Sequence, residues 1–307
     1  MRLFKSLALS LFITTFFVVS LGFCDENIKL TPSGNVVDMN ILLKYPYVVS
    51  RLSNKEDKLQ PLDIILCVEH KKEKFKSIKK MQEIMKLSKE NITVEFLRDG
   101  NIEKQKMMSD ELRTYKFKDT IYGAGTITAI DKHGNYVGLA HSIKLNEKDK
   151  VSIVKGIIYE TSYVQEVKSQ DGKVGHLETS STSKKIGTVD NMTEYGIKGK
   201  YNKFKCDPSK ALEVGNPKLG KAYIYCETPV TNEFKLHEIE ITEVREDSSS
   251  ITIKDKSLIN CRGGGVQGMS GSPIIQDNKI VGGFRYIVVS DATRGGIANI
   301  HSMLENE

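Results

Sequence analysis

Apolar and polar positions follow one pattern before about residue 113 and a different one after it. In the first part, residues 62–68 and 91–97 read as strands, because their apolar side chains form a short run or alternate with polar ones. Between them, the segment 77–88 has apolar residues at helical spacing behind a serine that can cap a helix. The apolar residues of that helix face are Ile78, Met81, Ile84 and Met85. Together with the turn at Asp99-Gly100, the pattern predicts a small α/β or α+β domain.

From residue 119 onward, short strand-like segments are separated by turns rich in Gly, Asn and Asp, as at His133-Gly134-Asn135. Such spacing predicts an all-β sandwich or barrel, and we expect a helix only near residues 300–305. Residues 27–62 are expected to form short irregular or strand-like pieces. A polar stretch at residues 113–118 separates the two patterns and marks the predicted domain boundary.

The N-terminus has the pattern of a secretory signal or an uncleaved membrane anchor. Two basic residues precede an uncharged apolar run at residues 6–23, and two acidic residues end it. A run of this length is near the minimum for crossing a bilayer, and its basic end is expected to stay in the cytoplasm. Because the bulky Phe23 makes a poor cleavage position, we favour an uncleaved anchor within residues 1–26 and export of the rest of the chain.

Composition narrows the class of protein. The chain has 307 residues, of which 39% are hydrophobic and 27% charged, as expected for a folded protein of about two domains. The net charge of +6 comes mostly from lysines spread along the chain, so no nucleic-acid partner is predicted. None of the five cysteines forms a C-x-x-C pair, which argues against a zinc ribbon or a thioredoxin-type site. Cys206 and Cys226 are a candidate disulfide if the protein is exported, which the sequence alone does not decide.

The segment 263–275 carries the most chemical information, because it contains G-x-S-G-S-P followed by an apolar strand. Chymotrypsin-like serine proteases hold their nucleophile in a loop of this kind. Glycines on both sides of the serine let the backbone turn sharply, which exposes the Ser270 Oγ and aims two N–H groups at one point. We expect the N–H groups of Gly268 and Ser270 to form an oxyanion hole. The simpler alternative is a glycine-rich turn with two ordinary serines.

A serine nucleophile needs a base, and His141 is the strongest candidate among the six histidines. It follows the apolar strand that starts at Tyr136 and is flanked by small residues, whereas the other histidines lie in charged or turn-like surroundings. A carboxylate is expected to fix the tautomer of this histidine. Spacing alone leaves several candidates, among them Asp190, Glu243, Asp247 and Asp255.

Three blocks of the sequence together resemble the SpoIVB (stage IV sporulation protein B) family, the S55 peptidases of endospore-forming bacteria. They are residues 123–128 leading to 138–141, residues 184–188 with 195–197, and residues 264–275. The resemblance covers roughly residues 119–305. By position, it implies that Ser270 is the nucleophile, His141 the base and Asp255 the acid of a catalytic triad.

The resemblance implies a mainly β protein with a chymotrypsin-like (trypsin-like) double β-barrel peptidase domain at residues 113–307. It implies a small α+β PDZ-like domain at residues 27–112, where Asp63-Ile64-Ile65 lies at the place of the Gly-Asp-x-Ile motif of such modules, with Pro61-Leu62 in place of the usual Ala-Gly-rich approach. This module is expected to be shortened, because it lacks a clear Gly-rich loop for a peptide carboxylate. No metal or organic cofactor is implied.

The resemblance also implies a function, that of an exported, membrane-tethered sporulation serine endopeptidase. Its expected partners are a membrane-bound regulatory protein as substrate, its own chain as a second substrate, and the membrane through its N-terminal segment. The expected location is the forespore intermembrane space, with the N-terminus in the forespore cytoplasm and sigma-factor activation in the mother cell as the outcome. The alternatives are a non-catalytic PDZ-containing adaptor and a family paralogue with a different target. An esterase is disfavoured, because the motif is not G-x-S-x-G between a strand and a helix.

Overall fold

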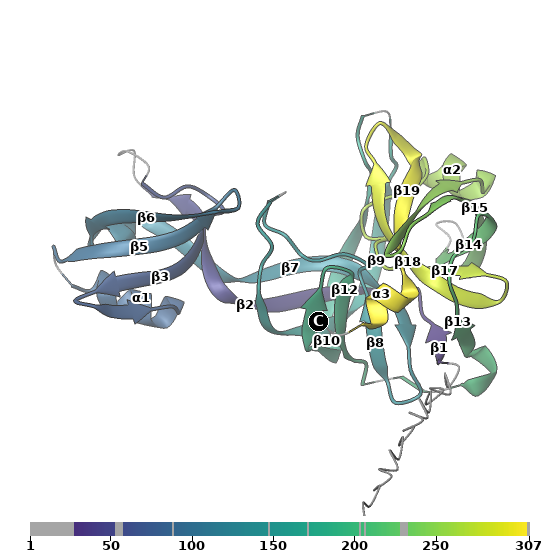
Figure 1. Cartoon of the computed structure of the whole chain (residues 1–307), viewed down its shortest axis with the longest axis horizontal. Helices are drawn as coiled ribbons and strands as arrows, with labels where there is room; N and C mark the ends of the chain where they lie inside the picture. Colours follow the sequence, from purple (N-terminus) through teal and green to yellow (C-terminus); the bar gives the residue numbers. More distant parts are fainter. Residues whose placement is uncertain are drawn as a thin grey trace, which may run out of the picture.

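The computed structural model describes residues 28–52, 58–87, 89–146, 148–170, 172–202, 204–205, 207–227 and 233–305. The predicted membrane anchor at residues 1–26 therefore lies outside the described residues. The described chain is mainly β. Figure 1 shows two β-barrels next to each other and a smaller module set apart from them, connected by the long strands β2 and β7. Within the described ranges, no helix is both long enough and apolar enough to cross a membrane.

Six strands close the first barrel. In pairing order they are β2 (Val36–Arg51), β7 (Tyr115–Ile130), β8 (Asn135–Gly138), β12 (Gly196–Lys200), β10 (His176–Val189) and β9 (Ile153–Val167), which returns to β2. Strand β12 meets β10 through a bridge between Tyr201 and Gly187. Alternate side chains face inward, and Ile41, Ile127 and Ile158 lie in the resulting apolar core.

Six further strands close the second barrel. In pairing order they are β14 (Gly220–Glu227), β15 (Phe234–Val244), β16 (Ser248–Ile253), β19 (Asp291–Asn299), β18 (Lys279–Val288) and β17 (Pro273–Gln276), which returns to β14. Ile224, Ile239 and Phe284 are buried in its core. The pair of barrels confirms the fold class predicted for the peptidase region.

The two barrels share an apolar seam. Strand β1 (Lys29–Pro32) pairs with β7 of the first barrel and with β13 (Leu212–Val214), which pairs with β18 of the second. The helix α3 (Ile300–Leu304), where a short helix was predicted, buries Ile300 and Met303 against residues of both barrels. Two small elements complete this region, the 3₁₀ turn η2 (Pro208–Lys210) and the strand β11 (Asn191–Thr193), which forms a hairpin with β12. The seam fixes the space between the barrels.

The smaller module contains β3 (Ile64–His70), β4 (Glu73–Phe75), α1 (Ile78–Met85), β5 (Asn91–Arg98), β6 (Asn101–Met108) and η1 (Glu111–Thr114). Met81 and Ile84 of α1 are buried in a separate apolar core, as the helical spacing predicted. The Ser77 hydroxyl accepts a hydrogen bond from the Lys80 N–H and caps this helix. The module is α+β as expected, and its likeness to a PDZ domain stays a prediction.

Residues 36–51 differ from the sequence-based expectation, because they form the single 16-residue strand β2 and not short irregular pieces. The register with β7 shifts between Leu42 and Tyr47, a stretch that contains Pro46. Proline has no N–H for the ladder, so it is tolerated in a strand only where pairing is interrupted. The alternating pattern on both sides of the proline belongs to one strand, which pairs with strands of the module and of the first barrel.

A second difference is the helix α2 (Lys256–Arg262), which was not predicted. Asp255 caps its N-terminus, and Gly263 ends it in the left-handed region with φ of 76°. An aspartate before a helix and a glycine after it are the usual boundary signals, and both are visible in the sequence. This helix leads directly into the glycine-rich loop.

Candidate active site

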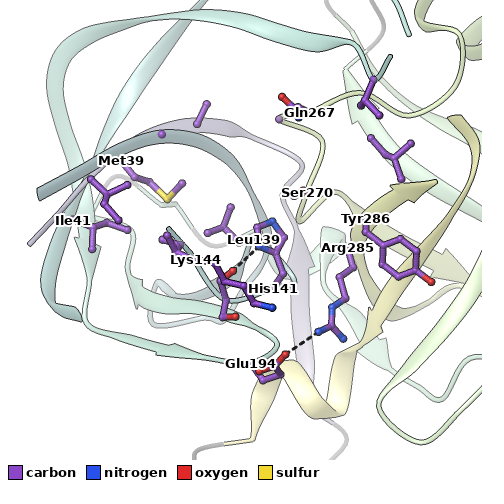
Figure 2. A pocket seen from close by; sticks show the side chains of 18 of the residues that line it. Met39, Ile41, Leu139, His141, Lys144, Glu194, Gln267, Ser270, Arg285 and Tyr286 are labelled. Carbon is purple, nitrogen blue, oxygen red and sulfur yellow. Dashed lines mark hydrogen bonds and ion pairs between the residues drawn. The ribbon is translucent and has the colours of Figure 1, made fainter. Parts of the chain in front are cut away.

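A pocket of about 670 Å³ lies between the two barrels. His141 and Glu194 line it from the first barrel, whereas Ser270 and Arg285 line it from the second (Figure 2). Apolar side chains form much of the remaining wall, including Met39, Ile41, Leu139, Ile143, Ile287 and Val289. The structure therefore brings the predicted base and the predicted nucleophile into one pocket.

A sharp backbone turn places His141 in the pocket. Strand β8 ends at Gly138, and Leu139 and Ala140 then adopt φ values of 65° and 57°, in the left-handed region. Two successive non-glycine residues in this region are strained, and such strain persists only where packing holds it. Both side chains are buried. The turn directs the imidazole toward the loop that carries Ser270 (Figure 2).

Hydrogen bonding determines which ring nitrogen of His141 can act as a base. Its Nδ1 lies 2.9 Å from the Ser142 carbonyl oxygen. A carbonyl oxygen can only accept, so Nδ1 carries the hydrogen and Nε2 keeps the free lone pair. A main-chain carbonyl therefore supplies the orienting contact that we had expected from a carboxylate.

The surroundings of His141 keep the imidazole neutral. Burial lowers the pKa of His141 below its ordinary value of 6.5, the hydrogen bond to Ser142 opposes this, and the charges of Arg285 and Lys144 lower the pKa further. The neutral imidazole is the form that can accept a proton. No hydrogen bond joins the imidazole to the Ser270 hydroxyl among the described residues.

Ser270 lies in the loop between α2 and β17, and strand β7 of the first barrel holds this loop on both sides of the serine. The Thr126 hydroxyl donates to the Gly268 carbonyl at 2.8 Å, and the Thr128 hydroxyl donates to the Gly271 carbonyl at 2.6 Å. The Thr126 N–H also donates to the Ser270 carbonyl at 3.0 Å. Both glycines have φ of 99°, a conformation that residues with a Cβ rarely adopt.

The N–H groups of Gly268 and Ser270 have no acceptor within the described chain. Their peptide planes are nevertheless fixed, because the carbonyls of Gln267 and Met269 accept main-chain N–H groups at 2.9 and 2.8 Å. In a trans peptide the C=O and N–H point in opposite directions, so these bonds also orient the two uncommitted N–H groups. The arrangement fits a pair of preorganised oxyanion donors.

The structure does not bring Asp255 to His141. The Asp255 carboxylate accepts from the Leu258 N–H at 2.9 Å and from the Ser257 hydroxyl, and it lies 3.4 Å from Nδ1 of the buried His237. Partial burial raises the pKa of Asp255, but these hydrogen bonds outweigh it and the pKa is lowered. No hydrogen bond or ion pair links it to His141 within the described ranges. The carboxylate is engaged at the end of α2 because it caps that helix.

The other acids considered from the sequence also lie in different surroundings. Asp190 lines another pocket, on the side of β8 and β12. Glu243 pairs with Arg245 in an exposed position. Asp247 accepts a hydrogen bond from the Ser302 hydroxyl at 3.0 Å.

Glu194 is the one carboxylate among the described residues that line the pocket of His141 and Ser270. It lies in the turn between β11 and β12, and its Oε1 is 3.3 Å from Nη2 of Arg285 on β18. It also pairs with Lys150. The hydrogen bond from Lys150 is the main cause that lowers the pKa of Glu194, and the charges of Lys150, Arg285 and Lys144 add to it against the opposing effect of burial. Glu194 is therefore ionised.

Comparisons with known proteins identify the family of this chain. Residues 114–304, more than half of the chain, match the sequence model of the SpoIVB peptidase S55 family. The chain belongs to this family. It is also similar to the solved structure of the Rv3671c protease from M. tuberculosis in its active form, with 14% sequence identity and a TM-score of 0.35 over 60% of this chain and 71% of that one. No curated protein matches it.

The family match confirms the resemblance seen in the sequence blocks and identifies the chain as a serine peptidase. Four residues of this S55 peptidase had no role predicted from its sequence: Thr126, Thr128, Glu194 and Arg285. The sequence contains a pattern that could have indicated the two threonines, since they lie two positions apart on one face of a strand whose end is buried. No sequence pattern indicates the pair of Glu194 and Arg285, because the fold alone brings the two residues together.

The buried Arg262 contacts the nucleophile loop of the S55 peptidase. The Arg262 side chain is 2% exposed and pairs with Glu166, with Nε 2.7 Å from Oε1. Its Nη1 lies 3.7 Å from the Met269 sulfur and 3.6 Å from the Cys226 sulfur. Cys226 is a free thiol whose pKa burial raises to about 11, and Cys206, its candidate disulfide partner, lies outside the described residues.

Proposed function

We propose that this S55 peptidase cleaves peptide bonds through an acyl-enzyme on Ser270, with His141 as the general base. One observation carries the proposal. Ser270 and a neutral His141, which keeps its Nε2 lone pair, line one pocket beside two uncommitted N–H groups. These are the groups that acyl transfer by a serine requires.

The proposed reaction starts when the Ser270 Oγ attacks the scissile carbonyl and His141 Nε2 takes its proton. The N–H groups of Gly268 and Ser270 then stabilise the negative oxygen of the tetrahedral intermediate, and one such donor contributes about 3–4 kcal/mol. The protonated His141 gives its proton to the leaving amine, which leaves an ester on Ser270. Water, deprotonated by the same imidazole, hydrolyses that ester.

The walls of the pocket suit a peptide with apolar side chains. Tyr286, near the end of β18, and Val289, just after it, are 49% and 57% exposed and line the pocket with Ile287. Exposed apolar groups at the rim of a cleft offer contact area to a bound chain. We propose that an extended segment of the substrate lies along β18, which borders the pocket.

The biological role that we propose rests on the family. The protein would be exported and tethered by its N-terminal segment, and it would cleave a membrane-bound regulatory protein between the forespore and mother-cell membranes. It would also cleave its own chain. The acid implied by the resemblance, Asp255, would act in this scheme at the N-terminus of α2, the helix that leads into the nucleophile loop.

Self-cleavage of the full-length chain, followed by intact mass, tests the proposal. We expect the wild type to be cut and the Ser270→Ala variant to stay intact, while a Ser180→Ala variant, altered at an exposed serine of β10, is cut like the wild type. A Ser270→Ala chain that is still cut would contradict the proposed nucleophile. In the sporulating bacterium, the same Ser270→Ala change is expected to block sigma-factor activation in the mother cell, and normal activation would contradict the proposed role.

A further inference from the structure

A second groove opens from the active-site pocket along the first barrel. It has a volume of about 730 Å³, and Met39, Gly123 and Ala124 line both this groove and the pocket of Ser270. A Cβ added to Gly123 would meet no atom within 4 Å, so the space at this junction is open. The groove is therefore continuous with the pocket in which the peptide bond is proposed to be cut.

Residues of β2, β7, β9 and β10 line the groove. Strand β10 is irregular here, because its register with β9 shifts between Ser181 and Lys185, and Ser183 has φ of 60°. Such bulges redirect a strand and are common next to functional sites. Tyr122 on β7 is 69% exposed, and its hydroxyl accepts a hydrogen bond from Asn40 Nδ2 at 3.2 Å. Most side chains that line the groove carry a hydrogen-bonding group, so the groove suits a polar ligand.

Asp38 on β2 gives the groove a carboxylate that is only half satisfied. Its Oδ1 accepts a hydrogen bond from the Thr179 hydroxyl at 2.9 Å, whereas its Oδ2 is buried and has no hydrogen-bond partner among the described residues. A carboxylate accepts at both oxygens, and a buried acceptor without a donor is unfavourable. The other charged residue of the lining is Lys185, whose side chain is exposed. An exposed ammonium keeps its water, so Asp38 is the charge that a ligand in the groove would recognise.

The proposed chemistry indicates which part of the substrate faces this groove. His141 gives its proton to the leaving amine, so the residue that follows the scissile bond lies on the His141 side of Ser270. His141 and Met39 line the pocket from the first barrel, and Figure 2 shows Met39 and Tyr286 of β18 at opposite sides of the pocket. The segment before the cut is proposed to lie along β18. The segment after the cut is therefore directed toward the groove.

We infer that this groove binds the substrate segment that follows the scissile bond, and that Asp38 selects a basic side chain, Lys or Arg, in that segment. An ammonium or guanidinium group would donate to the uncommitted Oδ2 and compensate the charge of the carboxylate. The polar groups of Asn40 and Tyr122 can bind the main chain of an extended peptide, which carries a donor and an acceptor at almost every residue. The inference rests on the proposed roles of Ser270 and His141, because it defines the substrate of the same site.

The test digests a peptide library with the full-length protein and maps the cut sites by mass spectrometry. The library is a proteome that has been cut after glutamate, so that lysine, arginine and aspartate remain inside the peptides. Cuts that also appear with Ser270→Ala are subtracted. Asp38→Asn removes the charge and keeps the shape of the side chain, and Asp38→Lys reverses the charge. Asp207→Asn is the matched control, because the Asp207 carboxylate also accepts from a hydroxyl, that of Ser209, but lines neither the pocket nor the groove.

We expect lysine and arginine to be enriched after the cut, on the order of 10-fold over aspartate, in the wild type and in Asp207→Asn, as for one hydrogen bond to a charged group. The enrichment should be lost in Asp38→Asn, and aspartate should replace the basic residues in Asp38→Lys. Gly123→Leu places a side chain in the open junction between groove and pocket. This variant should lose much more of its cleavage of the library than of its labelling by a fluorophosphonate probe.

A wild type without a preference for basic residues after the cut would overturn the inference, and so would a preference that persists in Asp38→Asn. Equal losses of cleavage and labelling in Gly123→Leu would remove the groove from the path of the substrate. If Asp38→Asn folds poorly by thermal melting, the wild-type cut sites and Gly123→Leu decide. The proposed function fails separately, when Ser270→Ala makes the same cuts as the wild type or when the wild type makes none.

Discussion

The Thr126 hydroxyl on β7 donates a 2.8 Å hydrogen bond to the Gly268 carbonyl, so a strand of one barrel holds the loop that carries the nucleophile of the other. Replacing Thr126 with Val keeps the shape and leaves this carbonyl without its partner. A fully buried acceptor without a partner costs about 1–3 kcal/mol, and this hydrogen bond is part-buried, so the free energy of unfolding should fall by at most that amount and probe labelling should slow. Thr182→Val, at an exposed threonine, is the control. Unchanged labelling in Thr126→Val would show that the loop does not need this bond.

Gly268 should tolerate no side chain. Its φ is 99°, and a Cβ would lie 3.1 Å from the Leu177 side chain. We expect Gly268→Ala to rotate the peptide that supplies one oxyanion donor and to slow labelling by about 10²- to 10³-fold. Gly100→Ala is a matched control, because Gly100 has φ of 84° with no atom near its added Cβ. Equal labelling in the two alanine variants would contradict the assignment of the oxyanion hole.

The reaction should tolerate mild acid. Burial, Arg285 and Lys144 lower the pKa of His141 below 6.5, so the neutral imidazole persists to lower pH than in a free histidine. Labelling is expected to fall only as the pH drops through this lowered pKa. The unfolded chain binds a proton there first, so this group removes stability as the pH falls below 6.5. A labelling midpoint above 6.5 in the wild type would contradict this environment.

Two substitutions at Asp255 separate its role as a helix cap from its role as a catalytic acid. Asn caps a helix nearly as well as Asp, so Asp255→Asn should melt like the wild type, whereas Asp255→Ala should lose about 1 kcal/mol of stability. The resemblance implies that Asp255 is the acid of the triad, so labelling of Asp255→Asn is expected to be slower than that of the wild type. If Asp255 oriented the base directly, its amide would slow the reaction by about 10⁴-fold. Labelling and thermal melting of both variants decide between the two roles.

Arg262 is expected to be important for stability. Breaking its buried pair with Glu166 leaves a charge without compensation, and such changes typically cost about 3–5 kcal/mol. Urea unfolding of Arg262→Met should show this loss. Arg245→Met, which breaks an exposed pair with Glu243, should change the midpoint little. Similar midpoints in both variants would contradict a supporting role for Arg262 behind the nucleophile loop.

The sequence was most informative where local chemistry dictates local structure. Helix α1 begins after its cap at Ser77, and Asp99-Gly100 forms the turn between β5 and β6 because both residues adopt positive φ. The glycines around Ser270 were identified for the same reason. Each of these features depends on residues that are neighbours in the chain, so a pattern of a few positions predicts them.

The sequence was least informative where the fold joins distant residues. Glu194 and Arg285 lie 91 positions apart, and no local pattern predicts that pair. Asp255 carries two local signals at once. Its position before the serine implied a catalytic acid, whereas the helix signals around it, Asp255 and Gly263, indicate a cap. A carboxylate can serve either role, so the catalytic role of Asp255 stays a prediction.

Labelling of the full-length protein with a fluorophosphonate probe, followed by peptide mapping, tests the central claim most directly. The account predicts one adduct, on Ser270, in the wild type, none at that position in Ser270→Ala, and much slower labelling in His141→Ala. Absence of an adduct on Ser270 in the wild type, or equal labelling of the His141→Ala variant, would contradict the claim that Ser270 and His141 form the reactive pair of this S55 peptidase.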